Sequence, residues 1–344
     1  MNLKALVNKL PPEATFEASH LLLRLPILPP LLKALGPRAS VPARLDHRTI
    51  DGPVGIGAGI DKDGLLIDLA AAMPVGFHVV GSITPSPREG NPRPRFLKYP
   101  ELGAMINAMG LPSRGAGTAL RIVKSKCASW PRSKLLIISA AGFTVEEVIR
   151  TARAASTIKC VDYVELNVSS PTYRGLWLEG DGLRRLLSEA ERLGKPALIK
   201  VPLLSDIDAE RRLISELAAS GLGLTIANTL PITAPLPRGY GGLSGAPINE
   251  LVISLIRIAR RVGHRGLIIG MGGFLDGASV MAGLRAGADL IGVVTAFAME
   301  GPAAIYRITA ELRRFPERRG GINGIASHGK VHDKSRLFGV GENF

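Results

Sequence analysis

The sequence has few aromatic residues, few cysteines and no long uncharged apolar run. Phe, Trp and Tyr together make up 5% of its 344 residues, and the two cysteines are Cys127 and Cys160. Neither cysteine lies in a paired motif with metal-ligand spacing, which excludes a disulfide-based scaffold and a Cys-rich metal site and predicts a reducing compartment. Asp, Glu and His do not cluster with ligand spacing either, so we expect no metal site.

Acidic residues are outnumbered by basic ones. The chain has 29 Asp and Glu against 43 Lys and Arg, a net charge of +14. Such a surplus attracts nucleic acid, anionic lipid or anionic small molecules without choosing among them. We expect no nucleic-acid partner, because no recognisable nucleic-acid domain is present and aromatics for base stacking are sparse. The 46% hydrophobic and 21% charged residues fit a folded globular protein.

The most apolar early stretch, LLLRLPILPPLLKAL (21–35), does not predict a membrane span. Basic residues and prolines interrupt it well before the ~20 uncharged residues that a spanning helix needs. It is also a poor secretory signal. We expect two short helices, at about 12–24 and 29–35, with apolar residues on one face. Such a pair either caps the core or lies in a membrane interface, and composition alone favours capping.

From residue 52 onward the chain repeats a short apolar run, a turn and an amphipathic stretch. The candidate strands are 52–59, 77–84, 135–140, 163–168, 197–202, 224–228, 267–273 and 290–296. The candidate helices are 62–73, 114–126, 144–157, 181–193, 206–220, 248–263, 276–286 and 302–314. Eight such units predict an α/β fold, a parallel (β/α)8 TIM barrel with a short N-terminal helical extension. A doubly wound sheet is the competing fold, but it usually has fewer units.

A barrel places its chemistry at the C-terminal ends of its strands, and nearly every predicted end carries a polar residue. Turn-forming Gly, Asn, Ser and Thr are common there for structural reasons. Lys62 and Lys200 are harder to explain in that way, because an inward lysine must be solvated or paired with an anion. Together they indicate an anionic ligand, although an ion pair with a carboxylate is the alternative for Lys200.

Glycine-rich turns at the last two strands favour phosphate binding. Gly272-Gly273 and Val294-Thr295, with a helix expected near Pro302, present backbone N–H groups to an anion. A planar cofactor held there would lie across the barrel mouth near Lys200 and Asn167, and a lysine at the electron-poor edge of a flavin stabilises the reduced ring. The long connection over 85–134 suggests a lid or binding element.

Nine segments of the sequence together resemble dihydroorotate dehydrogenases. They are VGIGAGIDKDG (54–64), VVGSITPSPREGNPRPRFLKYP (79–100), MINAMGL (105–111), LNVSSP (166–171), ALIKV (197–201), ANT (227–229), GGLSGAP (241–247), IIGMGG (268–273) and GADLIGVVTAFAMEGP (287–302). The likeness covers about residues 10–315 in the same order. Ser170, where the soluble class has Cys, and the helices expected over 12–35 resemble the quinone-dependent, membrane-associated class (class 2).

The resemblance implies an FMN-dependent enzyme that oxidises dihydroorotate to orotate in de novo pyrimidine (UMP) biosynthesis and passes the electrons to a quinone. It implies a helical extension over 1–45 that gives quinone and membrane access, a barrel over 46–315 and a polar tail over 316–344. The implied location is peripheral, on the cytoplasmic side of the cell membrane. The resemblance therefore favours a membrane-interface role for the two N-terminal helices over simple capping of the core.

The matched positions imply roles for individual residues. Those implied to bind the flavin are Ala58, Gly59, Ile60, Asp61, Lys62, Ser82, Asn167, Lys200, Gly245, Gly273, Val294 and Thr295. Those implied to bind the substrate are Lys62, Asn107, Ala108, Met109, Gly110, Leu111, Asn167, Asn228 and Thr229. Ser170 matches the catalytic base, although a lone serine is a weak base that is more often only a turn former.

The sequence departs from the family pattern at several positions. Thr172-Tyr173 stand where the family has Asn-Thr after Ser-Pro. Leu111 stands for the Phe of the quinone class, Ser139 for a flavin-contacting Asn, Ala227 for a Thr, and Lys98 for an Arg near the quinone path. Losing one hydrogen bond to a charged ligand typically costs ~1.5–3 kcal/mol, so these changes bear on which substrate is bound.

Two alternative functions remain open on the sequence. One is a related flavin barrel that acts on another reduced pyrimidine or a uracil-like base, including bases in RNA. The other is a non-enzymatic protein that keeps the barrel and flavin but has lost turnover. The joint presence of Lys62, Asn107, Asn167, Ser170 and Lys200 argues against the second alternative.

Overall fold

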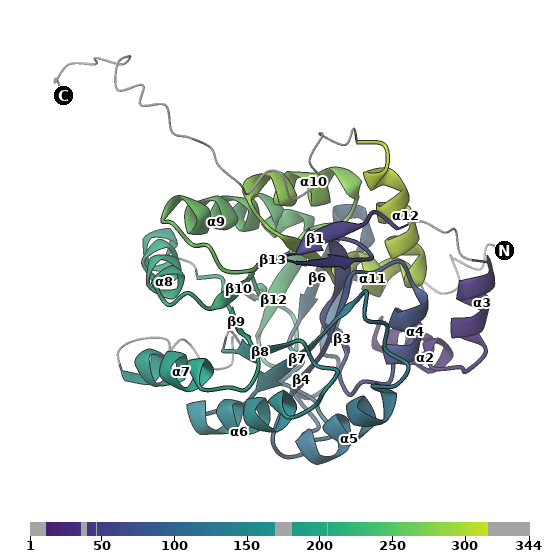
Figure 1. Ribbon diagram of the computed structural model, residues 1–344, viewed down its shortest axis with the longest axis horizontal. Coiled ribbons are helices and arrows are strands. Elements are labelled where there is room, and N and C mark those ends of the chain that lie inside the picture. Colours follow the sequence, from purple (N-terminus) through teal and green to yellow (C-terminus); the bar gives the residue numbers. More distant parts are fainter. Residues whose placement is uncertain (1–11, 36–39, 46, 169–180, 205, 316–344) are drawn as a thin grey trace.

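Eight parallel strands close into a barrel in the computed structural model, which describes residues 12–35, 40–45, 47–168, 181–204 and 206–315 (Figure 1). They are β3 (Val54–Asp61), β4 (Phe77–Ile83), β7 (Leu135–Ala141), β8 (Tyr163–Asn167), β9 (Ala197–Lys200), β10 (Gly223–Ile226), β13 (Ile268–Met271) and β14 (Leu290–Val293). Each corresponds to one predicted strand, and β14 pairs with β3 to close the ring. The predicted (β/α)8 barrel is confirmed.

Helices surround the barrel (Figure 1). They are α4 (Ile67–Ala72), α5 (Ala116–Lys126), α6 (Val145–Ser156), α7 (Asp181–Glu191), α8 (Ile207–Ala219), α9 (Asn249–Arg261), α10 (Gly277–Ala286), α11 (Thr295–Glu300) and α12 (Pro302–Leu312). Several begin where a polar side chain accepts a hydrogen bond from the first turn, as Thr144 does from the Glu147 N–H and Asp276 from that of Ser279. Such caps satisfy N–H groups that the helix itself leaves unpaired.

The core has two layers, as expected for a barrel. Val, Ile and Leu of the strands pack outward against the apolar faces of the helices. The residues of the opposite strand faces fill the barrel interior, and they include Phe77, Ile137, Leu198 and Met271. Strands that are apolar on both faces therefore result from burial between the helices and the barrel axis.

A four-stranded antiparallel sheet that the sequence analysis did not predict joins two segments remote in the chain. Its order is β11 (Leu230–Thr233), β12 (Tyr240–Gly245), β6 (Ala104–Asn107) and β5 (Phe96–Tyr99). The predicted binding element over 85–134 therefore contributes β5 and β6. Short 3-10 turns follow β5 and β12 at Pro100–Leu102 and Ala246–Ile248, and a separate hairpin is formed by β1 (Ala43–Leu45) and β2 (Arg48–Ile50).

Two helices precede the barrel, at nearly the predicted positions: α2 (Pro12–Leu23) and α3 (Leu28–Leu35). Ion pairs fasten α2 to the segment that leads into β5. The buried Glu13 accepts hydrogen bonds from Arg95 Nε at 2.6 Å and from the Arg95 backbone N–H at 3.0 Å, and Glu17 pairs with Arg93 at 2.5 Å. Within the described ranges, no helix is long and apolar enough to cross a bilayer.

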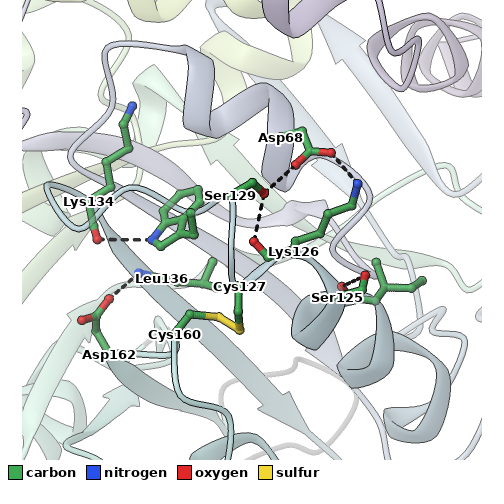
Figure 2. Close-up of a disulfide and its surroundings, with 11 residues drawn as sticks. Asp68, Ser125, Lys126, Cys127, Ser129, Lys134, Leu136, Cys160 and Asp162 are labelled. Atoms are coloured by element: carbon green, nitrogen blue, oxygen red, sulfur yellow. Dashed lines mark hydrogen bonds and ion pairs between the residues drawn. A yellow bond between two sulfur atoms is a disulfide. The ribbon is translucent and has the colours of Figure 1, made fainter.

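The two cysteines form a disulfide, which corrects the sequence-based reasoning about them. Cys127 follows α5, Cys160 precedes β8, and their sulfur atoms are bonded although the residues are 33 positions apart (Figure 2). The predicted reducing compartment rested on the lack of a paired motif and thus loses its basis. The pairing arises because consecutive β/α units lie side by side in the barrel, which brings the ends of α5 and α6 together.

Candidate functional site

A pocket of about 220 Å³ opens at the C-terminal ends of the barrel strands and under the antiparallel sheet. Its wall takes residues from the ends of β3, β4, β8 and β9 and from the turns after β10, β13 and β14. The loop that follows β6 and the strand β12 complete it. The site therefore lies where a barrel is expected to hold its ligand.

Two lysines give the pocket its positive charge. Lys200 ends β9 and is 4% exposed. Lys62 follows β3 directly, and burial, followed by the positive charge of Arg95, lowers its pKa to about 8. Lys62 is therefore mainly cationic at pH 7 but is close to losing its proton. Both lysine side chains line the pocket wall, so an anionic ligand would offset the free-energy cost of burying their charges.

Three asparagines converge on the same pocket from different elements. Asn107 ends β6, Asn167 ends β8 and Asn228 follows β10. Asn167 is 5% exposed, and its Nδ2 donates to Ser82 Oγ. An amide offers both donors and an acceptor, so this set suits a flat ligand with carbonyl and N–H groups.

A fourth asparagine, Asn91, lines the pocket and holds the loop after β6, a role that the sequence analysis missed. Its Nδ2 donates to Ala108 O at 2.9 Å, and its backbone N–H donates to Met109 O at 3.0 Å. Leu111 in this loop has φ of 56°, a conformation uncommon for a residue with a side chain. The loop over 108–111 is thus held by both the side chain and the backbone of Asn91.

Glycines form two parts of the pocket wall. In the interpretation of the sequence, these parts face a flavin ring and its phosphate. Gly59 has φ of 104°, and a Cβ there would enter open space, so a flat ring can approach the backbone directly. Gly272 and Gly273 have φ of 130° and 75°, and Asn249 Nδ2 holds their turn by donating to Gly272 O at 3.1 Å. The residues present therefore fit a planar cofactor with an anionic tail.

Most of the residues implied by the resemblance lie in the pocket wall. These are Ala58, Gly59, Ile60, Lys62, Ser82, Asn107, Ala108, Met109, Gly110, Leu111, Asn167, Lys200, Asn228, Thr229, Gly273, Val294 and Thr295. Asp61 instead points into the turn after β3, where its carboxylate accepts backbone N–H groups. Gly245 lies behind the wall, with its carbonyl against Gly273. Ser170, Thr172 and Tyr173 lie outside the described residues.

Aromatic and apolar wall residues from the antiparallel sheet were also missed by the sequence analysis. Phe96, Met105 and Tyr240 line the pocket from β5, β6 and β12. No local pattern places these strands over the barrel, since each is short and pairs with a segment far away in the chain. The residues GGLSG (241–245) of one resembling segment form most of β12.

Fold and pocket together define a (β/α)8-barrel protein whose pocket, at the C-terminal ends of its strands, is suited to a flat, anionic ligand. The family model described as dihydroorotate dehydrogenase matches residues 42–315. The chain belongs to the dihydroorotate dehydrogenase family, which confirms the family predicted from the resemblance.

Relatives and solved structures agree with this assignment. The chain is 35% identical to "Dihydroorotate dehydrogenase (quinone)" from Xanthomonas campestris, covering 78% of this chain and 83% of the relative. It is 35% identical to the protein of the same name from Anaeromyxobacter dehalogenans, covering 92% and 93%. The crystal structure of DHODH from Eimeria tenella in complex with ferulenol superposes with a TM-score of 0.76 at 25% identity, covering 87% of this chain and 90% of that one.

Proposed function

We propose that this chain is a quinone-dependent dihydroorotate dehydrogenase, which oxidises dihydroorotate to orotate in pyrimidine biosynthesis with bound FMN. The observation that carries the proposal is the convergence of two lysines and three asparagines on one pocket in a barrel of this family. The relatives that cover most of the chain carry the quinone-linked name.

FMN would lie across the barrel mouth. Its ring would face Ala58, Gly59 and Lys200, and its phosphate the backbone of Gly273, Val294 and Thr295. When bound, FMN supplies a hydride acceptor that can be oxidised again by a quinone. Lys200 would stabilise negative charge on the reduced ring, because its ammonium group is buried at the pocket wall.

The asparagines and Lys62 would bind the substrate and recognise its polar groups. Dihydroorotate is a small ring with one carboxylate and several carbonyl and N–H groups, which match amide side chains and one cation. Asn107, Asn167 and Asn228 would orient the ring, and Lys62 would pair with its carboxylate. The loop 108–111 and Thr229 would complete the contacts.

Ser170, by its matched position, would remove the proton from the substrate carbon next to the one that gives up hydride. A serine needs help to act as a base at neutral pH, because its ordinary pKa is far too high. Ser170 would therefore have to pass its proton on as it accepts the new one. Anaerobic reduction of a Ser170→Ala variant by dihydroorotate tests this role.

The helices α2 and α3 would attach the enzyme to a membrane surface from which the quinone enters. Five apolar residues in these helices and the connection between them are 45–71% exposed: Leu21, Leu22, Leu25, Ile27 and Leu31. Arg24 and Lys33 lie exposed among them and suit anionic headgroups. We propose a peripheral location on the cytoplasmic side of the cell membrane, with 1–45 as the attachment segment, 46–315 as the catalytic barrel and 316–344 as a polar tail.

Helix α2 lies near the pocket, which would suit entry of the quinone from this surface. The charges acting on His20 in α2 include those of Asp61 and Lys62, so the helix passes close to the turn after β3. Burial, followed by Arg24, lowers the pKa of His20 to about 4, so it is neutral at pH 7. Lys98 stands where the family has an Arg near the quinone path. Its pKa is lowered by burial, and its ammonium group donates to Ala298 O in the pocket wall at 3.1 Å.

The decisive experiment is anaerobic and follows the visible flavin spectrum. Dihydroorotate should bleach the oxidised spectrum of the purified protein, and a ubiquinone or menaquinone analogue should restore it. A flavin that dihydroorotate leaves oxidised would reject this substrate. It would favour the alternative, a related barrel acting on another reduced pyrimidine or a uracil-like base, which the same titration can then test.

A further inference from the structure

A buried carboxylate, Glu165, lies inside the barrel near the pocket and has no part in the function proposed above. It lies in β8, two positions before Asn167, and has no exposed surface. Side chains two positions apart on a strand share a face, so Glu165 and Asn167 both point toward the barrel interior. The register pairs Glu165 with Leu198, which belongs to the interior apolar cluster.

Two hydroxyl groups from other strands donate to this carboxylate. Ser139 Oγ in β7 lies 2.7 Å from Glu165 Oε1, and Thr225 Oγ1 in β10 lies 2.8 Å from Oε2. All three residues are fully buried. An ionised carboxylate only accepts hydrogen bonds, so it fixes the direction in which both hydroxyl protons point.

The fixed direction of the hydrogen bonds extends from Ser139 to Ser82 and Asn167 at the pocket wall. Ser82 Oγ lies 3.5 Å from Ser139 Oγ, at the long end of hydrogen-bonding distance. Since Ser139 gives its only proton to Glu165, it can act toward Ser82 as an acceptor alone. Ser82 then gives its own proton to Ser139 and accepts from Asn167, which agrees with the bond from Asn167 Nδ2 to Ser82 Oγ.

We propose that Glu165 is a positioning residue that, through Ser139 and Ser82, sets the orientation of the Asn167 amide at the pocket wall and adds a fixed negative charge to the barrel interior near the flavin. The inference rests on the proposed function only for its effect on the flavin. The effect on Asn167 requires no ligand. Ser139, which departs from the family's asparagine, thus serves the carboxylate rather than a ligand directly.

The first test needs no cofactor. In the apoprotein with ¹⁵N-labelled asparagine, assigned with Asn167→Asp, the Asn167 side-chain amide should exchange its protons slowly in the wild type. It should exchange roughly tenfold faster or more in Glu165→Gln. The glutamine amide can both donate and accept, so it no longer fixes the direction of the hydrogen bonds from Ser139 to Asn167. Ser139→Ala should have the same effect. Unchanged exchange in both variants would overturn the positioning role.

The second test measures the reduction potential of bound FMN. Removing a buried negative charge favours the reduced, more anionic flavin, so Glu165→Gln should shift the potential to a more positive value. Thr225→Val is the matched control, because it removes one hydroxyl partner but keeps both the charge and the path through Ser139. It should leave the amide exchange and the potential near those of the wild type.

The two readouts separate the possible failures. A wild-type protein that binds no flavin would refute the proposed function, while the amide exchange would still decide the role of Glu165. A protein that binds flavin with the same potential in wild type and Glu165→Gln would overturn the electrostatic part of the inference. An equal positive shift in Thr225→Val would also overturn it, by tracing the shift to general loosening of the interior.

Discussion

Asp61 and His78, on adjacent barrel strands, form a buried pair in which His78 Nε2 lies 2.9 Å from Asp61 Oδ2. The same carboxylate accepts the backbone N–H groups of Gly64 and Leu65 at 2.9 Å and of Leu66 at 3.1 Å. It thereby holds the turn that carries Lys62 into the pocket. Asp61 matches a flavin position by sequence, but its bonds make it a support for that turn.

Asp61→Asn should loosen this turn. Its amide nitrogen cannot accept a hydrogen bond, so at least one buried donor loses its partner, which costs about 1–3 kcal/mol of unfolding free energy. Orotate binding should weaken as well, because Lys62 is no longer held in place. Chemical denaturation and orotate titration measure the two effects. Asp68→Asn, at a half-exposed ion pair with Lys126, is the control: it should change the unfolding free energy by at most about 1 kcal/mol and leave orotate binding unchanged.

Orotate binding should depend on the protonation of Lys62. Burial lowers the pKa of Lys62 to about 8, so its positive charge is present below that pH and is lost as the pH rises through it. The Kd for orotate should therefore rise above pH 8, approaching about tenfold per pH unit. Lys62→Met should bind weakly at all pH values and show no such rise. A wild-type Kd that stays constant from pH 7 to pH 10 would contradict the role of Lys62.

The Cys127–Cys160 disulfide should contribute measurably to stability. Closing a loop of 33 residues restricts the unfolded chain and is worth about 3–4 kcal/mol in the chain-entropy description. The double variant Cys127→Ser, Cys160→Ser should unfold at a temperature several degrees lower, measured by calorimetry. Wild-type protein treated with a reductant should behave like the variant, and identical midpoints with and without reductant would show that the bond contributes nothing.

The exposed apolar residues of α2, α3 and their connection should govern attachment to lipid. Leu22→Ser together with Ile27→Ser should reduce sedimentation with anionic vesicles, because two large side chains leave the surface that would enter the interface. Each removes about 1.5–3 kcal/mol of apolar burial, a loss of tenfold or more in binding. Val262→Ser, at an exposed residue after α9, is the control, and equal loss in this variant would argue against a localised surface.

Ser170→Ala should separate flavin binding from chemistry. Its proposed role is to accept the substrate proton, so the variant should keep the oxidised flavin spectrum but lose rapid anaerobic reduction by dihydroorotate. A positioned base typically contributes 10²–10⁴-fold, which stopped-flow absorbance can measure. Rapid reduction at the wild-type rate would remove Ser170 from that role. The spectrum of the same sample provides the internal control for flavin content.

The sequence by itself determined the barrel and most of the pocket wall. Apolar runs alternating with amphipathic stretches specify strands and helices locally, and parallel strands in one barrel end at one rim. Lys62, Asn167 and Lys200 could therefore be assigned to a common site before any contact was known. Their positions follow from the strand ends alone.

Only the tertiary structure decided which distant residues meet. The antiparallel sheet, the Cys127–Cys160 bond, the Asp61–His78 pair and the hydroxyl partners of Glu165 all join segments that a local pattern does not connect. Glu165 sits in an apolar strand where its charge has no explanation in the sequence. Barrel closure supplies one, because it brings Ser139 and Thr225 to the carboxylate in a space that water does not reach.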